Sequence, residues 1–342
     1  MIRLKIEAFC REREREIGSQ FTHTYYTIIS VENLLIAWQE FLRGKRNRHD
    51  VSEFSPYFID NILTLHDELL HKNYQHNRYQ AFKINDPKPR DIHKASVRDR
   101  LVHHAIYRVL YPYVDRKFIF DSFSCRINKG THRAINRFRE YGRKVSRNNS
   151  RTVWVLKCDV KKFFASIDHE TLKRILKKYI QDPDTLWLLG QVIDSFHAEG
   201  NISTGLPIGN LTSQLLVNVY MNEFDQFVKH DLKVRCYIRY ADDWVILSEN
   251  KSYLENLIPK ISGFLKPQLR LSLHPDKVFI KTLASGVDFL GWVHFPHHRV
   301  LRTATKRRMI KRLRYTNTKE TATSYLGMLK HGNTYKLAKR IM

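Results

Sequence analysis

The stretch Cys236-Tyr-Ile-Arg-Tyr-Ala-Asp-Asp-Trp-Val-Ile-Leu-Ser248 places two adjacent carboxylates, Asp242 and Asp243, between two runs of aromatic and β-branched residues. Such runs are typical of strands, so the stretch predicts a β-hairpin with both acids at its turn. Two like charges about 4 Å apart repel by roughly 4 kcal/mol at an effective dielectric constant near 20. A divalent cation would reverse that repulsion; a solvated Asp-Asp turn is the ordinary alternative.

A third carboxylate follows another predicted strand. Residues 152–158 form a nearly continuous apolar run typical of a buried strand, and Asp159 comes directly after it. A helix cap is the alternative role for such an acid. With Asp242 and Asp243 it gives three carboxylates on two strands. That set can hold two Mg²⁺ ions about 3.5–4 Å apart for in-line phosphoryl transfer.

The charge of the chain indicates a polyanionic partner. Its 342 residues include 59 Lys and Arg against 34 Asp and Glu, a net charge of +25. Such an excess usually means nucleic acid, with an anionic membrane as the less common case. No run of 18 apolar residues and no signal peptide is evident, so we expect a cytoplasmic protein without a membrane partner. The four cysteines are scattered singly, which predicts free thiols.

The remaining segments predict a mixed helical and strand protein. The sequence predicts mostly helices over residues 1–80 and a strand over 79–85. It also predicts a strand ending in a turn over 271–277 and a hairpin over 287–295. Helices are predicted at 97–111, 134–145, 169–180, 215–227 and 253–265, and again from Arg302. Two prolines hold Lys88 and Arg90 on an extended turn, where they could clasp a triphosphate.

Two basic runs and one glycine-rich loop have both a structural and a functional interpretation. The basic runs are either solvated surface or contacts to a nucleic-acid backbone. The first contains Arg43, Lys45 and Arg46, and the second contains Lys306, Arg307, Arg308, Lys311 and Arg312. Gly205, Pro207 and Gly209 precede a predicted helix. They form an ordinary loop, or one that lets another backbone or a base pair approach closely.

In this order the segments resemble the motifs of a reverse transcriptase. The resemblance covers roughly residues 80–295 and rests on these residues: Lys88 and Arg90, Asp159 with Phe164, residues 205–214, Tyr240-Ala-Asp-Asp243, His274-Pro-Asp-Lys277 and Phe289-Leu-Gly-Trp292. It implies an α+β right-hand polymerase fold, whose palm is an antiparallel sheet packed on helices. Residues 1–80 would then extend the fingers, residues 81–295 form the fingers and palm, and residues 296–342 form a basic helical thumb.

The resemblance also implies roles for individual residues. Asp159, Asp242 and Asp243 match the acids that bind two Mg²⁺ ions, with Mn²⁺ as a substitute, and the Val160 carbonyl is a further candidate ligand. Phe164 matches the aromatic gate against a 2′-hydroxyl, which implies deoxynucleotide substrates, although Phe163 and Phe164 are also both plausible core residues. Lys88 and Arg90 match the residues that hold the triphosphate, and Lys277 matches a lysine near the incoming phosphates.

One departure from the common pattern narrows the resemblance. Most reverse transcriptases carry Gln-Gly-x-x-x-Ser-Pro before the hairpin, whereas this chain has Ile208-Gly209-Asn-Leu-Thr-Ser-Gln214. This run is similar to that of diversity-generating retroelements, which makes Ile208, Gly209 and Gln214 candidate nucleotide-binding residues. That family copies a template-repeat RNA through a cDNA/RNA hybrid, misincorporates opposite adenines for mutagenic retrohoming, and uses a small basic accessory protein.

Two other interpretations stay open. The chain could be another prokaryotic reverse transcriptase, of the retron, abortive-infection, phage-defence or group II intron-like kind. It could also be a nucleic-acid-binding protein that kept the fold without catalysis, although all three acids are present. Because the chain ends at Met342, we expect no RNase H, maturase or homing endonuclease domain after the thumb.

Overall fold

The protein is described by a computed structural model that covers residues 25–85, 89–316 and 318–341. Lys88 therefore lies outside the described residues. The chain divides into two compact units. Unit 1 consists of Met1–Ile84, Arg90–Lys117 and Phe164–Tyr220, and unit 2 consists of Asn85–Pro89, Phe118–Phe163 and Met221–Met342.

Unit 1 is mainly helical. Its helices are α2 (Tyr25–Ile29), α3 (Val31–Phe41), α4 (His49–Phe54), α5 (Phe58–Leu70), α6 (Val97–Asp115), α8 (His169–Tyr179), α9 (Pro183–Asp194) and the first part of α10 (Leu211–Gln226). Ser30 and Ser96 cap α3 and α6 by accepting hydrogen bonds from the backbone N–H groups of Asn33 and Asp99. Helices α3 and α6 pack against each other, because each has a buried apolar face.

A two-stranded antiparallel hairpin completes unit 1. Strand β1 (Gln80–Ile84) pairs with β2 (Arg90–Lys94), and the register places Ile84 opposite Arg90. The side chains of β1 are exposed, including the large apolar Phe82 and Ile84. The hairpin therefore offers an apolar and basic surface instead of contributing a core.

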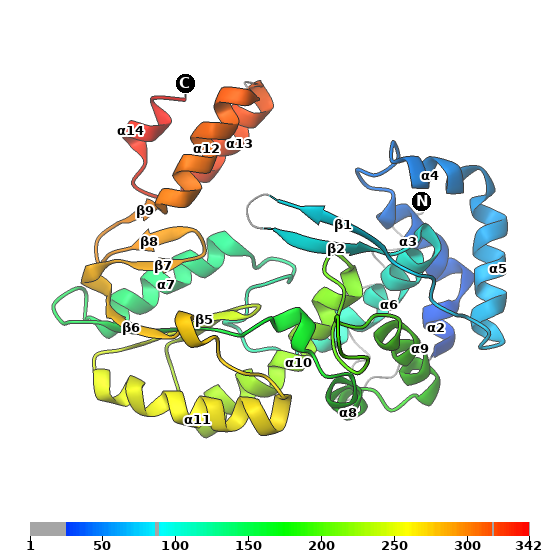
Figure 1. The fold of residues 1–342 in the computed structure, drawn as a ribbon, viewed down its shortest axis with the longest axis horizontal. Helices are drawn as coiled ribbons and strands as arrows, with labels where there is room; N and C mark the ends of the chain where they lie inside the picture. Colours follow the sequence, from blue (N-terminus) through cyan, green and yellow to red (C-terminus); the bar gives the residue numbers. More distant parts are fainter. Residues whose placement is uncertain (1–24, 86–88, 317, 342) are drawn as a thin grey trace, which may run out of the picture. The chain divides into compact units, whose positions relative to one another are not determined.

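The centre of unit 2 is a four-stranded antiparallel sheet of order β4-β5-β3-β6. Its strands are β3 (Trp154–Asp159), β4 (Tyr237–Tyr240), β5 (Asp243–Ser248) and β6 (Phe279–Thr282). Helices α7 (Thr131–Val145) and α11 (Lys251–Leu269) lie on opposite sides of it (Figure 1). Because side chains alternate along a strand, Val155 and Val245 pack in the core shared with Phe138 of α7.

A second sheet and the last helices form the rest of unit 2. Strands β7 (Val287–Phe289), β8 (Trp292–His294) and β9 (Arg299–Leu301) pair in sequence order, followed by α12 (Thr303–Tyr315), α13 (Lys319–Leu329) and α14 (Tyr335–Ala338). Trp292 is buried in a cluster with Met309 and Leu329. A Cβ on Gly332 would lie 2.0 Å from the Trp292 ring, so only glycine lets this loop cross that ring.

Most predicted elements are confirmed, and one is wrong. Of the strand ending in a turn that was expected at 271–277, the turn is confirmed as a 3₁₀ turn at Pro275–Lys277, but the strand is only an isolated pairing of Leu273 with Val160. Pro275 has no N–H to donate to a ladder, and the His274 side chain caps the turn by accepting from Asp276 N. Helix α10 begins four residues before its predicted start, and β6, β9 and α9 were not predicted. Among the described residues, no helix has the length and apolar content needed to cross a membrane.

Candidate active site

Strand register brings the three predicted acids to one end of the sheet of unit 2. Tyr240 of β4 pairs with Asp243 of β5, so Ala241 and Asp242 form the turn of the predicted hairpin, whereas Asp243, also expected at the turn, is the first residue of β5. Asp159, the last residue of β3, is the register partner of Asp243. Directly paired residues of antiparallel strands have Cα atoms about 4.5–5.5 Å apart. Residues far apart in the sequence therefore become neighbours through strand pairing alone.

A buried ion pair supports the hairpin turn. Ala241 has a left-handed backbone conformation with φ of 55°, which costs a non-glycine residue of the order of 1 kcal/mol. The Nη1 atom of Arg239 donates to the Ala241 carbonyl at 3.2 Å. Its Nε and Nη2 donate to the two carboxylate oxygens of Asp225 at 2.8 and 2.7 Å, and both side chains are fully buried. Burial alone lowers the pKa of Arg239, but Asp225 outweighs it and raises that pKa.

The acids are partly neutralised by two lysines. Burial raises the pKa of Asp243 to about 6; Lys157 opposes this rise, while Asp159 and Asp242 add to it. Lys157 Nζ lies 3.2 Å from Asp243 Oδ2, and Lys277 Nζ lies 3.1 Å from Asp159 Oδ2. The buried Oδ1 of Asp243 has no hydrogen-bond partner among the described residues. The cluster is therefore short of positive charge.

The chemistry of these donors fits a divalent metal ion. Carboxylate oxygens are the ligands that Mg²⁺ and Mn²⁺ prefer, and Oδ1 of Asp243, which has no hydrogen-bond partner among the described residues, is available to bind such an ion. In the part of the chain that the structure describes, no three His, Cys, Asp or Glu side chains converge into a metal site. The hydrogen bonds beside Val160 run from Lys161 N to Ser272 O and from His274 N to Asp159 O, so the Val160 carbonyl takes no part in this pairing.

In unit 1, the predicted loop is clamped to strand β2. His93 N donates to the Ile208 carbonyl at 3.2 Å, and Asn210 Nδ2 donates back to the His93 carbonyl at 2.8 Å. Gly205 has φ of 112°, and a Cβ there would lie 2.7 Å from Ala198 N. Gly209 has φ of 110°, with the side chain of Ile92 close to it. Both glycines are required by backbone geometry, and the loop has a fixed position on the hairpin.

The loop and the hairpin enclose a cavity of about 610 Å³ in unit 1. Of the predicted residues, Lys45, Gly209 and Gln214 line it. The other lining residues include several that sequence reasoning missed: Phe82, Ile92, Lys94 and Arg100. Asp50 pairs with both Lys94 and Arg100, so part of this basic wall is already neutralised. The alternation of side chains along β1 and β2 could have placed Phe82, Ile92 and Lys94 on this surface.

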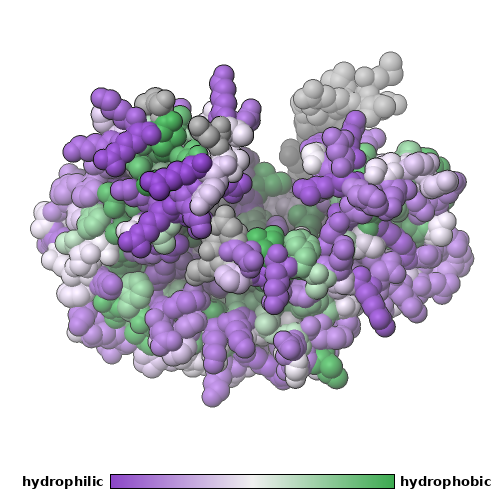
Figure 2. Space-filling view, turned by 45° about the horizontal axis from the view of Figure 1, so that its top comes forward, coloured by the Kyte–Doolittle hydropathy of each residue, from purple (hydrophilic) through white to green (hydrophobic). Residues whose placement is uncertain are grey.

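The remaining predicted residues lie elsewhere in the two units. Arg90 is exposed at the start of β2. Phe163 is buried and Phe164 half-buried, so one of the two belongs to the core. Exposed basic residues include Arg43 and Arg46 after α3, and Lys306, Arg307, Lys311 and Arg312 on α12, where Arg308 is half-buried. Hydrophilic side chains cover much of the face seen in Figure 2.

Replacing Arg239 with Met should destabilise the protein strongly. Removing one partner of a buried pair leaves Asp225 charged and uncompensated, which costs about 3–5 kcal/mol of unfolding free energy. Urea denaturation measures it. Exposed Arg235, on the same segment, is the matched control, and Arg235→Met should change stability by less than about 0.5 kcal/mol. Adding Asp225→Asn to Arg239→Met should recover part of the loss; no recovery would contradict a role for charge.

Replacing Asp243 with Asn should stabilise the metal-free protein at pH 8 but not at pH 4. The folded-state pKa of Asp243 is raised to about 6, so the wild type loses stability as pH rises from about 4 through 6. Asn has no charge to desolvate and should add on the order of 2 kcal/mol at pH 8. Chemical denaturation in a chelator at both pH values tests this. Exposed Asp231→Asn is the control, and an Asp243→Asn variant no more stable than wild type at pH 8 would refute the argument.

Known proteins resemble this chain over most of its length. Residues 83–294 match the family described as reverse transcriptase (RNA-dependent DNA polymerase). Protein YkfC of Escherichia coli (strain K12) is 27% identical over 285 residues, covering 72% of this chain and 72% of YkfC. Group II intron-encoded protein LtrA of Lactococcus lactis subsp. cremoris is 22% identical, covering 84% of this chain and 59% of LtrA. The solved structure of apo telomerase from Candida tropicalis, truncated from its C-terminal domain, aligns with a TM-score of 0.49 and 12% identity, covering 71% of this chain and 60% of that chain.

The family match covers more than half of the chain and contains Asp159, Asp242 and Asp243. The antiparallel sheet packed on helices agrees with the predicted α+β right-hand polymerase fold class, which is confirmed. Members of this family act on RNA templates and deoxynucleoside triphosphates and generally use divalent metal ions. The chain belongs to the reverse transcriptase family and is an RNA-directed DNA polymerase.

Proposed function

We propose that this polymerase makes mutagenised cDNA from a template-repeat RNA, as the enzyme of a diversity-generating retroelement. The observation that carries the proposal is the loop residue Ile208, in a run that ends at Gln214 instead of Pro. The His93 backbone fixes this loop on β2 through Ile208 and Asn210, so each of its side chains has a defined place. A substitution in a rigid loop changes what the loop can recognise more than where it lies.

The side chain of Ile208 suits an enzyme with relaxed base selection. A Gln at this position can donate and accept hydrogen bonds at a forming base pair and so respond to its geometry. Ile208 is half-buried and offers only an apolar contact. A site without a hydrogen-bonding group loses discrimination, because a mismatched base then leaves no protein polar group unpaired. The proposal assigns the errors opposite template adenines to this loss.

The chemical step is assigned to the acids and lysines of unit 2. Asp159, Asp242 and Asp243, with the Val160 carbonyl, would hold two divalent ions, Mg²⁺ or Mn²⁺, which supply Lewis-acid stabilisation of the reacting phosphate. Lys157 and Lys277 neutralise Asp243 and Asp159 in the metal-free chain. Lys277 is 45% exposed at its side chain and can turn toward the phosphates of a nucleotide. There its charge would stabilise the leaving pyrophosphate.

Nucleotide and strand binding are assigned to the remaining predicted residues. Lys88 and Arg90 would hold the triphosphate, Phe164 would exclude a 2′-hydroxyl, and Gly209 and Gln214 would contact the nucleotide. The exposed arginines and lysines after α3 and on α12 would follow the backbone of the RNA template or the cDNA/RNA hybrid. The proposed accessory protein is itself basic, so two cationic chains would meet through the RNA that both bind.

A second candidate function is retrohoming or defence by a reverse transcriptase with ordinary fidelity. The likeness to the group II intron-encoded protein LtrA favours it. Both candidates require the same chemistry and differ in the error spectrum of the product. Sequencing of cDNA made on an adenine-rich template therefore separates them.

Asp242→Asn should abolish DNA synthesis while RNA binding stays within about twofold of wild type, because RNA phosphates are bound by positive charges and the substitution removes none. Losing several kcal/mol of transition-state stabilisation corresponds to a drop of at least about a hundredfold in rate. Primer extension with Mg²⁺ and deoxynucleoside triphosphates measures it, with the cognate RNA and accessory protein included. Asp231→Asn is the control, and synthesis by Asp242→Asn at the wild-type rate would remove the assignment.

Ile208→Gln should lower misincorporation opposite template adenines by roughly tenfold, the effect of one good hydrogen bond in the transition state. The measurement is the error spectrum of sequenced cDNA made from one RNA by wild type and variant. Ile202→Gln is the matched control, because Ile202 is 80% exposed and belongs to the same segment. An unchanged error spectrum in Ile208→Gln would disprove the role of this residue.

A further inference from the structure

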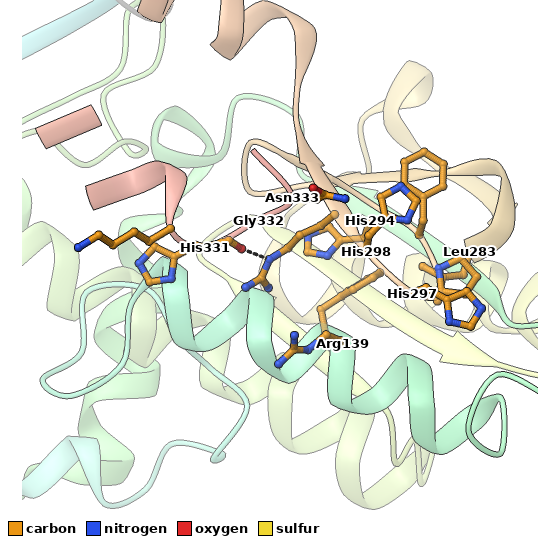
Figure 3. A pocket seen from close by; sticks show the side chains of 13 residues that line it. Arg139, Leu283, His294, His297, His298, His331, Gly332 and Asn333 are labelled. Atoms are coloured by element: carbon orange, nitrogen blue, oxygen red, sulfur yellow. Dashed lines mark hydrogen bonds between the residues drawn. The ribbon is translucent and has the colours of Figure 1, made fainter. Parts of the chain in front are cut away.

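A second cavity, in unit 2, is lined by cationic side chains and contains no carboxylate. It measures about 360 Å³ and is formed by α7, the turn between β8 and β9, and the loop after α13 (Figure 3). The basic and imidazole residues that line it are Arg139, Arg299, Lys330, His294, His297, His298 and His331. No Asp or Glu is among the lining residues. We call this space the arginine cavity.

Arg299 is the buried charge of the arginine cavity. The side chain belongs to β9, and the residue is only 9% exposed. Its Nε donates to the His331 carbonyl, and its Nη2 donates to Asn136 Oδ1 at 2.8 Å. Its Nη1 has no hydrogen-bond partner in any described part of the chain. A buried guanidinium held only by neutral acceptors lacks the compensation that burial of a charge requires.

The other cations of the cavity are also without counter-ions. Within residues 25–85, 89–316 and 318–341, neither Arg139 nor Lys330 forms an ion pair, and both are exposed. In Figure 3, Arg139 projects from α7, and His331 lies on the loop after α13. Burial lowers the pKa of Arg299, and the nearby charge of Arg139 adds to this effect. The electrostatic potential in the cavity therefore favours an anion.

The cavity walls are held in place before any ligand binds. Asn333 N donates to the Arg299 carbonyl at 2.8 Å, which ties the loop after α13 to β9. Gly332 lies against the Trp292 ring, as described above. The ring of His331 stacks on that of His132, with 3.6 Å between their centroids. A cavity whose walls are fixed by these contacts loses little entropy on binding.

We propose that the arginine cavity binds a phosphate group, with Arg139, Arg299 and Lys330 supplying the charge and His297, His298 and His331 supplying hydrogen-bond donors. Guanidinium groups match the oxygens of a phosphate, and a space of this size holds one phosphate with part of the molecule attached to it. The bound phosphate group is part of a nucleic-acid strand, or it is a small phosphate compound free in solution. That a nucleic-acid strand supplies the phosphate rests on the proposed function. The existence of the phosphate site does not.

The first test compares wild type with the double variant Arg139→Gln/Lys330→Gln, whose two side chains are exposed. Inorganic phosphate should raise the melting temperature of wild type by about 2 °C or more over chloride at equal ionic strength. Sodium acetate should not. The double variant should lose at least half of this shift, and Lys260→Gln, an exposed lysine of α11, should keep all of it. An equal shift in the double variant, or the same shift with acetate, would overturn the proposal.

The second test identifies the source of the phosphate. Binding of a fluorescent single-stranded RNA is measured by anisotropy at several salt concentrations. If a strand supplies the phosphate, the double variant binds RNA more weakly, and the slope of log K against log salt falls by about 0.7 for one lost contact. If a free phosphate is the ligand, RNA binding matches that of Lys260→Gln while the thermal shift is still lost. Asp242→Asn should keep the phosphate shift, so failure of the polymerase assignment and failure of this site give different results.

Discussion

Repulsion among three carboxylates is the constraint on which the rest of unit 2 depends. Strand pairing places Asp159 beside Asp243, with Asp242 on the adjoining turn, and burial of Asp243 adds the cost of desolvating its charge. The sheet withstands this because its centre is apolar on both faces and is covered by α7 and α11. Two lysines offset part of the charge. A bound cation, or protonation of Asp243 at low pH, would relieve the repulsion that remains.

The geometry of the turn is supported by Arg239, whose charge is also stabilised by Asp225 and Asp242. The guanidinium of Arg239 donates to the Ala241 carbonyl and pairs with Asp225, and the two charged side chains are fully buried. A buried pair seldom adds stability over apolar residues of the same size, but it is specific in direction. Here that direction keeps Ala241 in a left-handed conformation and so aims the two acids that follow. Stability and orientation are thus supplied by different groups.

The sequence alone predicted the hairpin, the strand before Asp159 and most helices, because each has a local pattern of apolar residues. It also located the three acids closely: Asp242 lies in the turn and Asp159 ends a buried strand as expected, while Asp243, expected in the turn, begins β5. The partnership of Arg239 with Asp225 was not predictable, because 13 intervening residues and a helix end separate them and only packing selects the pair. The strand expected at 271–277 failed because Pro275 and the cap by His274 outweighed its alternation. The arginine cavity was likewise invisible, since its cations come from three distant segments.

Base selection and chemistry are carried by different parts of the chain in the proposed function. The acids belong to the sheet of unit 2, whereas Ile208 belongs to a loop of unit 1 that β2 holds by two hydrogen bonds. Substitutions at positions that share no partner generally have additive free-energy effects. A change at Ile208 can then alter which nucleotide is accepted without altering the acids that promote its incorporation. In the proposed function, the apolar side chain of Ile208 would relax recognition of the nucleotide and leave the metal-binding groups intact.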